Sequence, residues 1–447
     1  MKLFTPFCIV FFIFANALHI QAQKLIFEPI SMSHGLSQHS VNAIIQDSTG
    51  FLWFATNDGL NRYNGYEFTI FKPIPGDAHS ISGNKITALL QDSERKIWVG
   101  MTMGGGLNIF DPSTETFSQC VNENGDSNFT HSISDIFEDN QKNVWIASYG
   151  GGLHYYDRKN NTFTNYTHNP HDRTSIASNS VRAVCQDAYG TIWVGMNVDG
   201  GLQKFNPETK TFTSVPFLNY DIMSIHNDSY GQLWIGTYYG GFGILNPKTE
   251  RYQTFTHTAR LQNELSNNIV WSFFEDKTTQ KMYVATRGGG LNIYNTQTHE
   301  FLETYQENES DFSIASNNIL AVHKDKSGVL WVGTENNGLS RCNTQRKNFK
   351  ILHAHNSAWL INIHSIIDEG NRMLIGTRGT GFHYIAKHSN NIRSFYSTNN
   401  SNKNYNSVNS MIYDPRGFYW IGTDGYGIFR FDAKTQQFEQ FEYNADN

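Results

Sequence analysis

The chain has 447 residues and a net charge of −6 without a basic run, which argues against a nucleic-acid-binding surface. Aromatic residues make up 14% of the sequence and charged residues 17%, with 37 glycines. This composition excludes a disordered chain and favours many short strands joined by tight turns.

The first 22 residues are predicted to be an export signal. Lys2 supplies a positive start, residues 3–18 are apolar, and Ala22 is a small residue at the cleavage position. An uncleaved anchor is the alternative, because the apolar run approaches the lower limit for spanning a bilayer. No other segment is apolar over a comparable length. We therefore expect a periplasmic protein with no membrane insertion after signal removal.

The rest of the chain repeats one pattern nine times. Each copy has an apolar strand ending in Asp, a turn, a strand centred on Trp, a Gly-rich turn and two aromatic strands. We call this Trp position the frame slot, and it recurs every 41–49 residues. A fixed period of this size is typical of repeat architectures. The frame slot holds Trp53, Trp98, Trp145, Trp193, Trp234, Tyr283, Trp331, Leu374 and Trp420.

The fourth copy predicts four strands, at residues 181–186, 191–194, 201–205 and 211–215. Their apolar character is nearly continuous, which indicates sheets covered on both faces. A ring of four-stranded antiparallel blades covers both faces and protects the strand edges. We predict an all-β fold, a β-propeller; a stacked solenoid is the rival architecture.

A lone outer strand precedes the first full copy, at residues 25–30. A second lone strand, at residues 349–354, follows the third strand of copy seven. We predict that the first strand completes copy seven, giving a signal peptide at 1–22, a seven-bladed propeller at 23–343 and two blades of a second, incomplete propeller at 344–447. A single nine-bladed ring is the alternative.

The residues that recur in every copy are interpreted as structural. A Trp that returns in the same frame serves the repeat and not one ligand, so we expect it to fill the gap between neighbouring blades. Tyr283 and Leu374 indicate that the frame slot requires bulk. The recurrent Asp residues are interpreted as turn formers.

The repeat GxLWxGTxxGGL resembles that of the two-component regulator propeller family. Residues 234–241 and 331–334 match it closely, and residues 35–65 look like the start of a periplasmic sensor of Bacteroidetes hybrid two-component systems. The resemblance covers essentially the whole mature chain. It implies two seven-bladed propellers ahead of an immunoglobulin-like domain, a membrane helix and a histidine kinase. It also implies recognition of an oligosaccharide that controls polysaccharide-utilisation genes. Because no kinase motif occurs here, we expect a truncated, non-enzymatic sensor part without signalling output.

Positions that differ between copies carry the information on ligands. The turns after the second strands and the starts of the first strands are expected to share one face of the propeller. Aromatic, amide, carboxylate and guanidinium groups there suit a polyhydroxylated ligand. The candidate ligand-binding residues are Trp271, Arg182, Arg287, Tyr149, Tyr238, Tyr239, Asn197, Asp199, Glu335, Asn336 and Asn42.

Two other functional classes stay open from the sequence. Propellers also serve as glycosidases and lyases, which need a nonrepeating acid/base pair; Asp58, Asp199 and Glu335 are nonrepeating acids. A protein-interaction scaffold would need a broad patch instead of a cleft. We predict no catalytic residue, no cofactor and no metal site, and we interpret residues 168–172, with two His and one Asp, as a solvated loop. A homodimer stays open.

Overall fold

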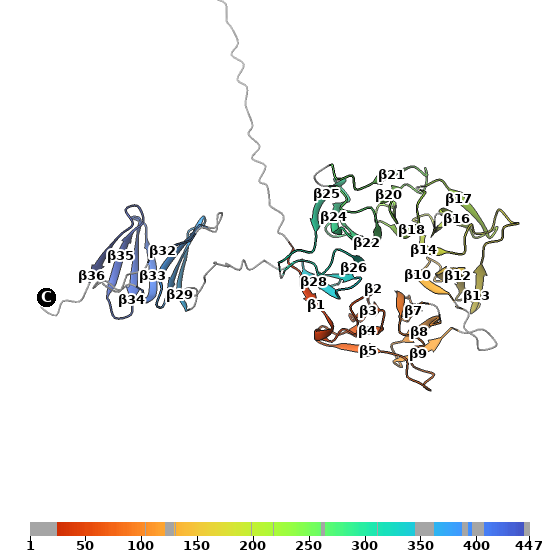
Figure 1. Ribbon diagram of the computed structural model, residues 1–447, viewed down its shortest axis with the longest axis horizontal. Helices are drawn as coiled ribbons and strands as arrows, with labels where there is room; N and C mark the ends of the chain where they lie inside the picture. The colour runs from red at the N-terminus through yellow and green to blue at the C-terminus, as the bar shows by residue number, and fades with distance from the viewer. Residues whose placement is uncertain are drawn as a thin grey trace, which may run out of the picture. The chain divides into compact units, whose positions relative to one another are not determined.

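The computed structural model describes residues 25–102, 104–120, 129, 131–197, 199–217, 219–260, 264–310, 312–344, 362–386, 392–395 and 406–441. It is an all-β chain in which the described residues form nine four-stranded antiparallel sheets (Figure 1). This architecture confirms the predicted β-propeller fold class. The predicted signal at 1–22 and the predicted strand at 349–354 lie outside the described residues.

The structure divides into two compact units, Met1–Arg346 and Lys347–Asn447. The first unit opens with β1 (Glu28–Ile30) and a 3-10 helix, η1 (Met32–His34). Its first three sheets are β2 (Val41–Gln46), β3 (Leu52–Thr56), β4 (Gly59–Tyr63), β5 (Phe68–Phe71); β6 (Ile86–Gln91), β7 (Ile97–Met101), β8 (Leu107–Asp111), β9 (Thr116–Gln119); and β10 (Ser132–Glu138), β11 (Val144–Tyr149), β12 (Gly152–Asp157), β13 (Thr162–Tyr166).

Three more complete sheets and a three-stranded segment follow in the first unit. They are β14 (Val181–Gln186), β15 (Ile192–Met196), β16 (Leu202–Asn206), β17 (Thr211–Val215); β18 (Ile222–Asn227), β19 (Leu233–Thr237), β20 (Phe242–Leu245), β21 (Tyr252–Phe255); β22 (Val270–Asp276), β23 (Lys281–Thr286), β24 (Gly290–Asn295), β25 (Glu300–Tyr305); and β26 (Ile319–Lys324), β27 (Val329–Thr334), β28 (Leu339–Asn343).

The second unit has two sheets among its described residues. They are β29 (Ile363–Asp368), β30 (Arg372–Thr377), β31 (Gly381–Ala386), β32 (Ile392–Phe395); and β33 (Val408–Asp414), β34 (Phe418–Thr423), β35 (Ile428–Asp432), β36 (Gln437–Phe441). We number the sheets as blades one to nine in chain order. The domain bounds of 23–343 and 344–447 remain our proposal for the chain.

The first unit closes on itself through its N-terminal strand. β1 pairs antiparallel with β28, with Pro29 opposite Ser340, so it supplies the fourth strand of blade seven. Phe27, which precedes β1, is fully buried, and its N–H donates to the carbonyl of Phe312 at 3.1 Å. The first strands of neighbouring blades contact one another all round, with β2 against β26 (Figure 1).

The frame Trp residues of the first unit are buried, as the sequence predicts. Trp193 is fully buried, and its indole N–H donates to the Asp187 carboxylate at 2.8 Å. The other carboxylate oxygen of Asp187 accepts the turn N–H of Thr191 at 2.9 Å. One Asp therefore forms the turn and also holds the indole, a pairing that the sequence analysis did not predict. The same Trp–Asp bond joins the pairs 53/47, 98/92, 145/139, 234/228 and 331/325.

A second repeated contact joins each blade of the first unit to the one before it. The residue just before the frame Asp reaches the turn or strand end of the preceding blade. Between blades one and seven this contact also closes the ring, because Gln46 accepts the N–H of Lys326 at 2.8 Å. The other contacts are Gln91–Ser48, Glu138–Ser93, Gln186–Asn140, Asn227–Gln186, Glu275–Ser229 and Lys324–Asp276. The residue before the frame Asp differs in type from blade to blade, so the repeat pattern did not predict these contacts.

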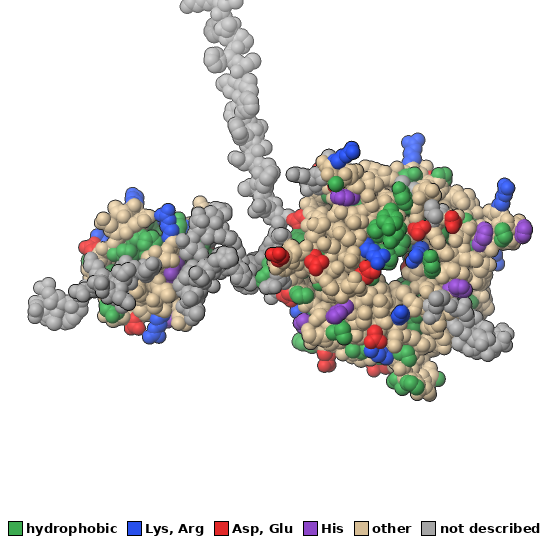
Figure 2. Space-filling view, in the orientation of Figure 1, with side chains coloured by type: hydrophobic (Ala, Val, Ile, Leu, Met, Phe, Trp, Pro, Cys, Tyr) green, Lys and Arg blue, Asp and Glu red, His purple; other side chains and the backbone are tan. Residues whose placement is uncertain are grey.

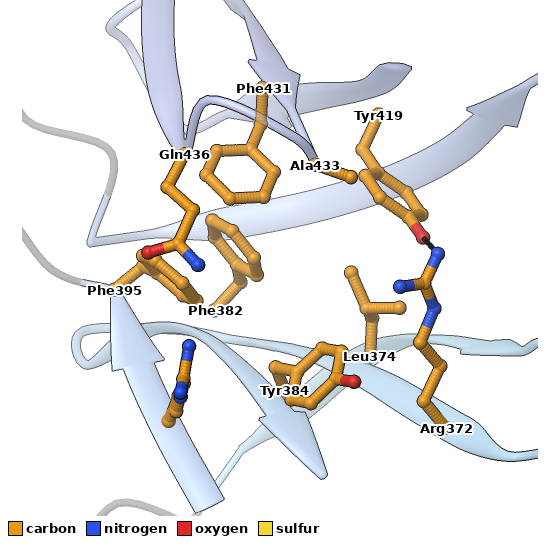
Figure 3. A pocket seen from close by; sticks show the side chains of 10 residues that line it. Arg372, Leu374, Phe382, Tyr384, Phe395, Tyr419, Phe431, Ala433 and Gln436 are labelled. Atoms are coloured by element: carbon orange, nitrogen blue, oxygen red, sulfur yellow. Dashed lines mark hydrogen bonds between the residues drawn. The ribbon is translucent and has the colours of Figure 1, made fainter. Parts of the chain in front are cut away.

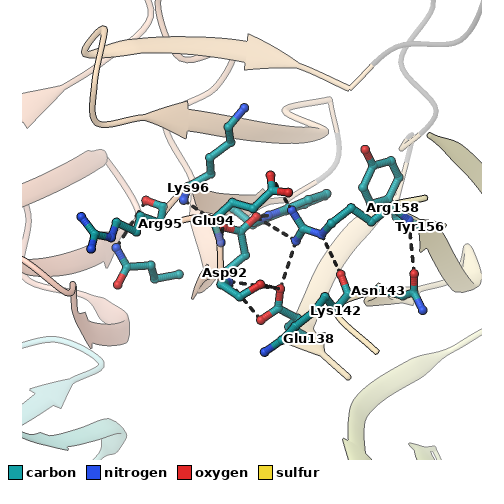
Figure 4. Close-up of polar contacts among 12 residues, drawn as sticks. Asp92, Glu94, Arg95, Lys96, Glu138, Lys142, Asn143, Tyr156 and Arg158 are labelled. Atoms are coloured by element: carbon teal, nitrogen blue, oxygen red, sulfur yellow. Dashed lines mark hydrogen bonds and ion pairs between the residues drawn. The ribbon is translucent and has the colours of Figure 1, made fainter. Parts of the chain in front are cut away.

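Arg158 adds an ionic contact between blades two and three (Figure 4). Its guanidinium lies 3.0 Å from a carboxylate oxygen of Asp92, 2.8 Å from Glu94 and 3.0 Å from Glu138. Asp92 is the frame Asp that also holds Trp98. The side chains of Asp92 and Glu138 are largely buried. Because Arg158 and Glu138 belong to blade three and Asp92 to blade two, the cluster links the two blades near the turns between their first and second strands.

Candidate functional site

One position in the first strand of every blade is a β-bulge. In blade one, Val41 pairs with Thr56 and Ala43 pairs with Ala55, so Asn42 has no partner in the register. A bulge bends the strand and redirects the side chain of the extra residue. The bulge residues of the first unit are Asn42, Thr87, Ser134, Arg182, Met223, Trp271 and Leu320. The sequence identified this position as variable but gave no sign of the bulge.

The bulge residues of the first three blades hold the ring together. The Asn42 amide donates to the carbonyl of Ile86 at 2.7 Å, and the Thr87 hydroxyl donates to that of Ile133 at 2.6 Å. Ser134 repeats the contact with Val181 at 2.7 Å. Asn42 thus has a structural role, and the site proposed below does not depend on it.

Larger side chains occupy the bulge in blades four to seven, and two of them make aromatic contacts. The Arg182 guanidinium lies 4.1 Å from the centre of the Tyr149 ring, in cation–π geometry. The Nε atom of Arg182 is buried without a hydrogen-bond partner in the structure. Tyr149 is 41% exposed, so this pair offers an aromatic edge together with an unused donor.

Blades six and seven share a second cluster, built on Arg287 at the end of β23. Its Nε donates to the Glu335 carboxylate at 3.0 Å, and its Nη2 donates to the second oxygen, which makes the pair bidentate. The same guanidinium lies 5.6 Å from the centre of the Trp271 ring. Both ionic side chains are about one-third exposed, so the cluster is open to solvent.

Blade five contributes two tyrosines to the same neighbourhood. The rings of Tyr238 and Tyr239 meet edge to face with centres 4.4 Å apart. Tyr239 has a φ of 80°, a conformation that bulky side chains rarely adopt, and is 61% exposed. A hydrogen bond with Tyr238 raises the pKa of the Tyr239 hydroxyl, while the positive charge of Arg287 opposes this shift.

The remaining candidates lie in the turns after β15 and β27. Asn197 builds its turn, because its carbonyl accepts the N–H groups of Gly200 and Gly201 at 2.8 Å, and its side-chain oxygen is buried without a hydrogen-bond partner. Asp199 and Asn336 are exposed. The structure therefore brings together Tyr149 with Arg182, and separately Trp271, Arg287 and Glu335 beside the two tyrosines of blade five. Among the described residues, no ring contact or ion pair joins the two groups.

The surroundings of the nonrepeating acids and of the loop at 168–172 are as follows. Glu335 and Asp58 are ion-paired, with Arg287 and with Lys72, while Asp199 is exposed. In the loop at 168–172, His168 Nδ1 contacts the carbonyl of Ile176 at 2.9 Å, while Asp172 accepts the Thr174 hydroxyl. Within the described part of the chain, no cluster of three or more His, Cys, Asp or Glu side chains could hold a metal ion.

The candidate face has a mixed character. We call it the bulge face: the side of the first unit where the first strands begin and the second strands end. In the view of Figure 2, hydrophobic side chains gather beside basic and acidic ones over the region of β18 and β22. Such a mixture is typical of sites that combine stacking with hydrogen bonding.

The pattern of the family described as "Two component regulator propeller" matches this chain at residues 35–58, 175–197, 216–239, 313–336 and 402–425. Each match spans the start of a blade up to the turn after its second strand. The chain thus carries five stretches that match the two-component regulator propeller repeat. Within the described residues, no helix is long and apolar enough to cross a membrane.

Similar proteins include a histidine kinase, named P4, of Formosa agariphila, 24% identical over 430 residues, 73% of this chain and 31% of the relative. Among solved structures, the extracellular domain of a hybrid two-component system of B. thetaiotaomicron has a TM-score of 0.68 and 24% identity, over 95% of this chain and 55% of that one. A streptogramin B lyase has a TM-score of 0.53 and 14% identity, over 71% of this chain and 98% of that one. The chain thus spans about a third of the curated relative and about half of the bacterial extracellular domain.

Proposed function

We propose that this propeller is the extracytoplasmic sensing part of a hybrid two-component system, exported to the periplasm, and that its bulge face binds an oligosaccharide that controls polysaccharide-utilisation genes. The family and the likeness to a sensor's extracellular domain support the sensing role. The cluster of Trp271, Arg287 and Glu335 beside Tyr239 carries the ligand proposal. Its members come from three consecutive blades, so a ligand would contact blades five, six and seven together.

The chemistry of this cluster suits sugars. The apolar faces of a pyranose ring stack on aromatic side chains, and Trp271 and the exposed Tyr239 ring provide such surfaces. The guanidinium of Arg287 presents fixed donors and the Glu335 carboxylate presents acceptors, which together match hydroxyl groups. Because the pair is already joined, both groups are held in place before a ligand arrives, which reduces the entropy lost on binding.

A thermal-shift screen of residues 23–447 against neutral and acidic oligosaccharides tests this proposal. We expect stabilisation by one glycan class and loss of at least tenfold in affinity for Trp271→Ala. Tyr230→Ala is the matched control, because Tyr230 is 56% exposed at a turn between first and second strands and should leave affinity unchanged.

Three outcomes would replace the proposal. Formation of a cleaved product would favour a lyase or glycosidase. Equal losses from both substitutions would remove the bulge face as the site. No stabilisation by any glycan, together with a captured protein, would favour an interaction scaffold. Light scattering with and without ligand measures whether the chain forms homodimers.

A further inference from the structure

The frame slot of blade eight holds Leu374 where seven other blades hold Trp. Leu374 is itself buried, but the space beside it is open: a cavity of about 320 Å³ lies between blades eight and nine. The sequence interpretation that the slot always requires bulk is therefore incomplete. Tyr283 fills its slot in blade six, whereas Leu374 leaves room.

Blade five shows what is missing at this position. There, the Phe242 and Phe255 rings stack with centres 4.8 Å apart and planes 12° apart, and Trp234 stacks on Phe242 at 5.3 Å. In blade eight, Phe382 and Phe395 occupy the corresponding strand positions and stack with the same 4.8 Å and 12°. The stack is thus preserved, but the indole that would continue it is absent.

The neighbouring blade completes the comparison. In blade six, Tyr294 meets Trp234 edge to face at 5.2 Å. Phe431 holds the same position in blade nine and lies 4.9 Å from Phe382 and 5.0 Å from Phe395. The walls that surround an indole between blades five and six are therefore also present between blades eight and nine. Here the walls face Leu374 and the buried ring of Tyr419, and the cavity opens beside these two side chains.

The cavity is polar at its ends. Figure 3 shows Arg372 beside Tyr419 at one end, and Gln436 near Phe395 at the other. Arg372 is occupied, because it is ion-paired with Glu369 and its Nη2 lies 3.3 Å from the Tyr419 hydroxyl. Arg393 also lines the cavity, is exposed, and forms no ion pair with another described residue.

We propose that this cavity binds a small aromatic carboxylate whose ring takes the place of the missing indole and whose carboxylate pairs with Arg393. The volume lies at the lower end of the range for ligand pockets. Leu374, Phe382, Phe395 and Phe431 give the middle of the cavity an apolar lining, and cavities lined by Leu and Phe are able to accept a flat aromatic molecule. The guanidinium of Arg393 favours an acid over its neutral analogue.

Indole-3-acetate is the probe, with indole and acetate as its two halves. Titration calorimetry and ligand-observed NMR on residues 23–447 are expected to show binding of indole-3-acetate, at least fivefold weaker binding of indole, and none of acetate. Arg393→Gln should reduce the affinity for indole-3-acetate to that for indole. Lys434→Gln, which removes an exposed cation of the same unit that does not line the cavity, is the matched control and should bind normally.

Leu374→Trp tests the position of the site directly, because it restores the residue that fills the slot in seven other blades. We expect it to abolish binding of indole-3-acetate and of indole while circular dichroism stays unchanged. Ala433→Met fills the same cavity from blade nine and serves if the first variant does not fold. Unchanged binding in either folded variant, or no binding by the wild-type chain at millimolar probe, would overturn the proposal. Neither result bears on the bulge face, since Trp271 belongs to the other unit.

Discussion

The pairing of Trp193 with Asp187 yields a quantitative prediction for the stability of the first unit. Trp193→Leu reproduces the natural arrangement of blade eight. The indole is fully buried, and truncating a buried aromatic side chain to Ala costs about 3–5 kcal/mol, of which the larger Leu side chain recovers part. The substitution also removes a hydrogen bond to a charged group, worth roughly 1.5–3 kcal/mol. Because the two losses overlap, we expect the free energy of unfolding to fall by about 4 kcal/mol.

A double-mutant cycle separates the hydrogen bond from the packing. Asp187→Asn keeps one oxygen for the turn N–H of Thr191 but places an amide against the indole N–H. We expect a coupling energy between Trp193 and Asp187 of about 1–3 kcal/mol. Urea unfolding of residues 23–447 followed by tryptophan fluorescence measures it, since seven of the nine tryptophans belong to the first unit.

Tyr283→Phe is the control for this cycle. Tyr283 fills the same slot, and its hydroxyl forms no hydrogen bond with another described residue, so removing the hydroxyl should cost less than about 1 kcal/mol. A coupling energy below about 0.5 kcal/mol would refute the idea that Asp187 holds the indole, because residues without a shared contact are additive within that range. The frame Asp would then be a turn former only.

Three further predictions concern the ring of the first unit. Burial raises the pKa of Asp135 to about 6, although two backbone N–H groups that donate to its carboxylate oppose this shift. The folded state therefore binds this proton more tightly than the unfolded state, and the free energy of unfolding falls as pH rises from about 4 to 6. Asp135→Asn should flatten this slope when urea midpoints are compared with those of wild type. The comparison cancels the opposite slope of His154 and His323 in the same unit, whose pKa values burial lowers to about 4. Phe27→Ala should cost about 3–5 kcal/mol and the half-exposed Ile26→Ala under about 1 kcal/mol; equal effects in thermal unfolding would contradict closure through β1. Thr87→Val loses the bond to the Ile133 carbonyl and should lower stability by about 1 kcal/mol, and no change would mean that the bulge tie does not contribute.

The sequence predicted the strands well because each blade repeats one pattern. In copy four the predicted first and fourth strands match β14 and β17 at both ends, and the middle strands differ by one or two residues. Burial of the frame Trp residues also followed from their repetition. The loop residues Ile176 and Ile314 stand in a matching Ser-Ile-Ala-Ser-Asn segment of two copies, and both are buried.

The contacts between blades could not be read from the sequence, because their chemistry changes from copy to copy. Gln46 accepts a backbone N–H, whereas Lys324 donates to a carboxylate at the same position of its blade. The candidate site shows the same limit. Variation identified Trp271 and Asn42 alike, but only the hydrogen bond to Ile86 shows that Asn42 belongs to the ring.

Each departure from the frame has its own physical consequence, and this separates scaffold from site. In blade six, Tyr283 makes no bond to the frame Asp, and Asp276 instead pairs with Lys324 at 2.6 Å, so the charge is compensated and the gap stays filled. In blade eight, Leu374 leaves the aromatic walls in place but removes the ring they surround. A lost hydrogen-bond partner is compensated locally by another side chain. The volume lost at Leu374 is compensated only in part: Tyr419 is buried beside it, but Phe382 and Phe395 keep their stacked geometry and a cavity remains. A loss of side-chain volume at the frame slot, more than a loss of its hydrogen-bond partner, therefore turns a packing position of this repeat into a binding position.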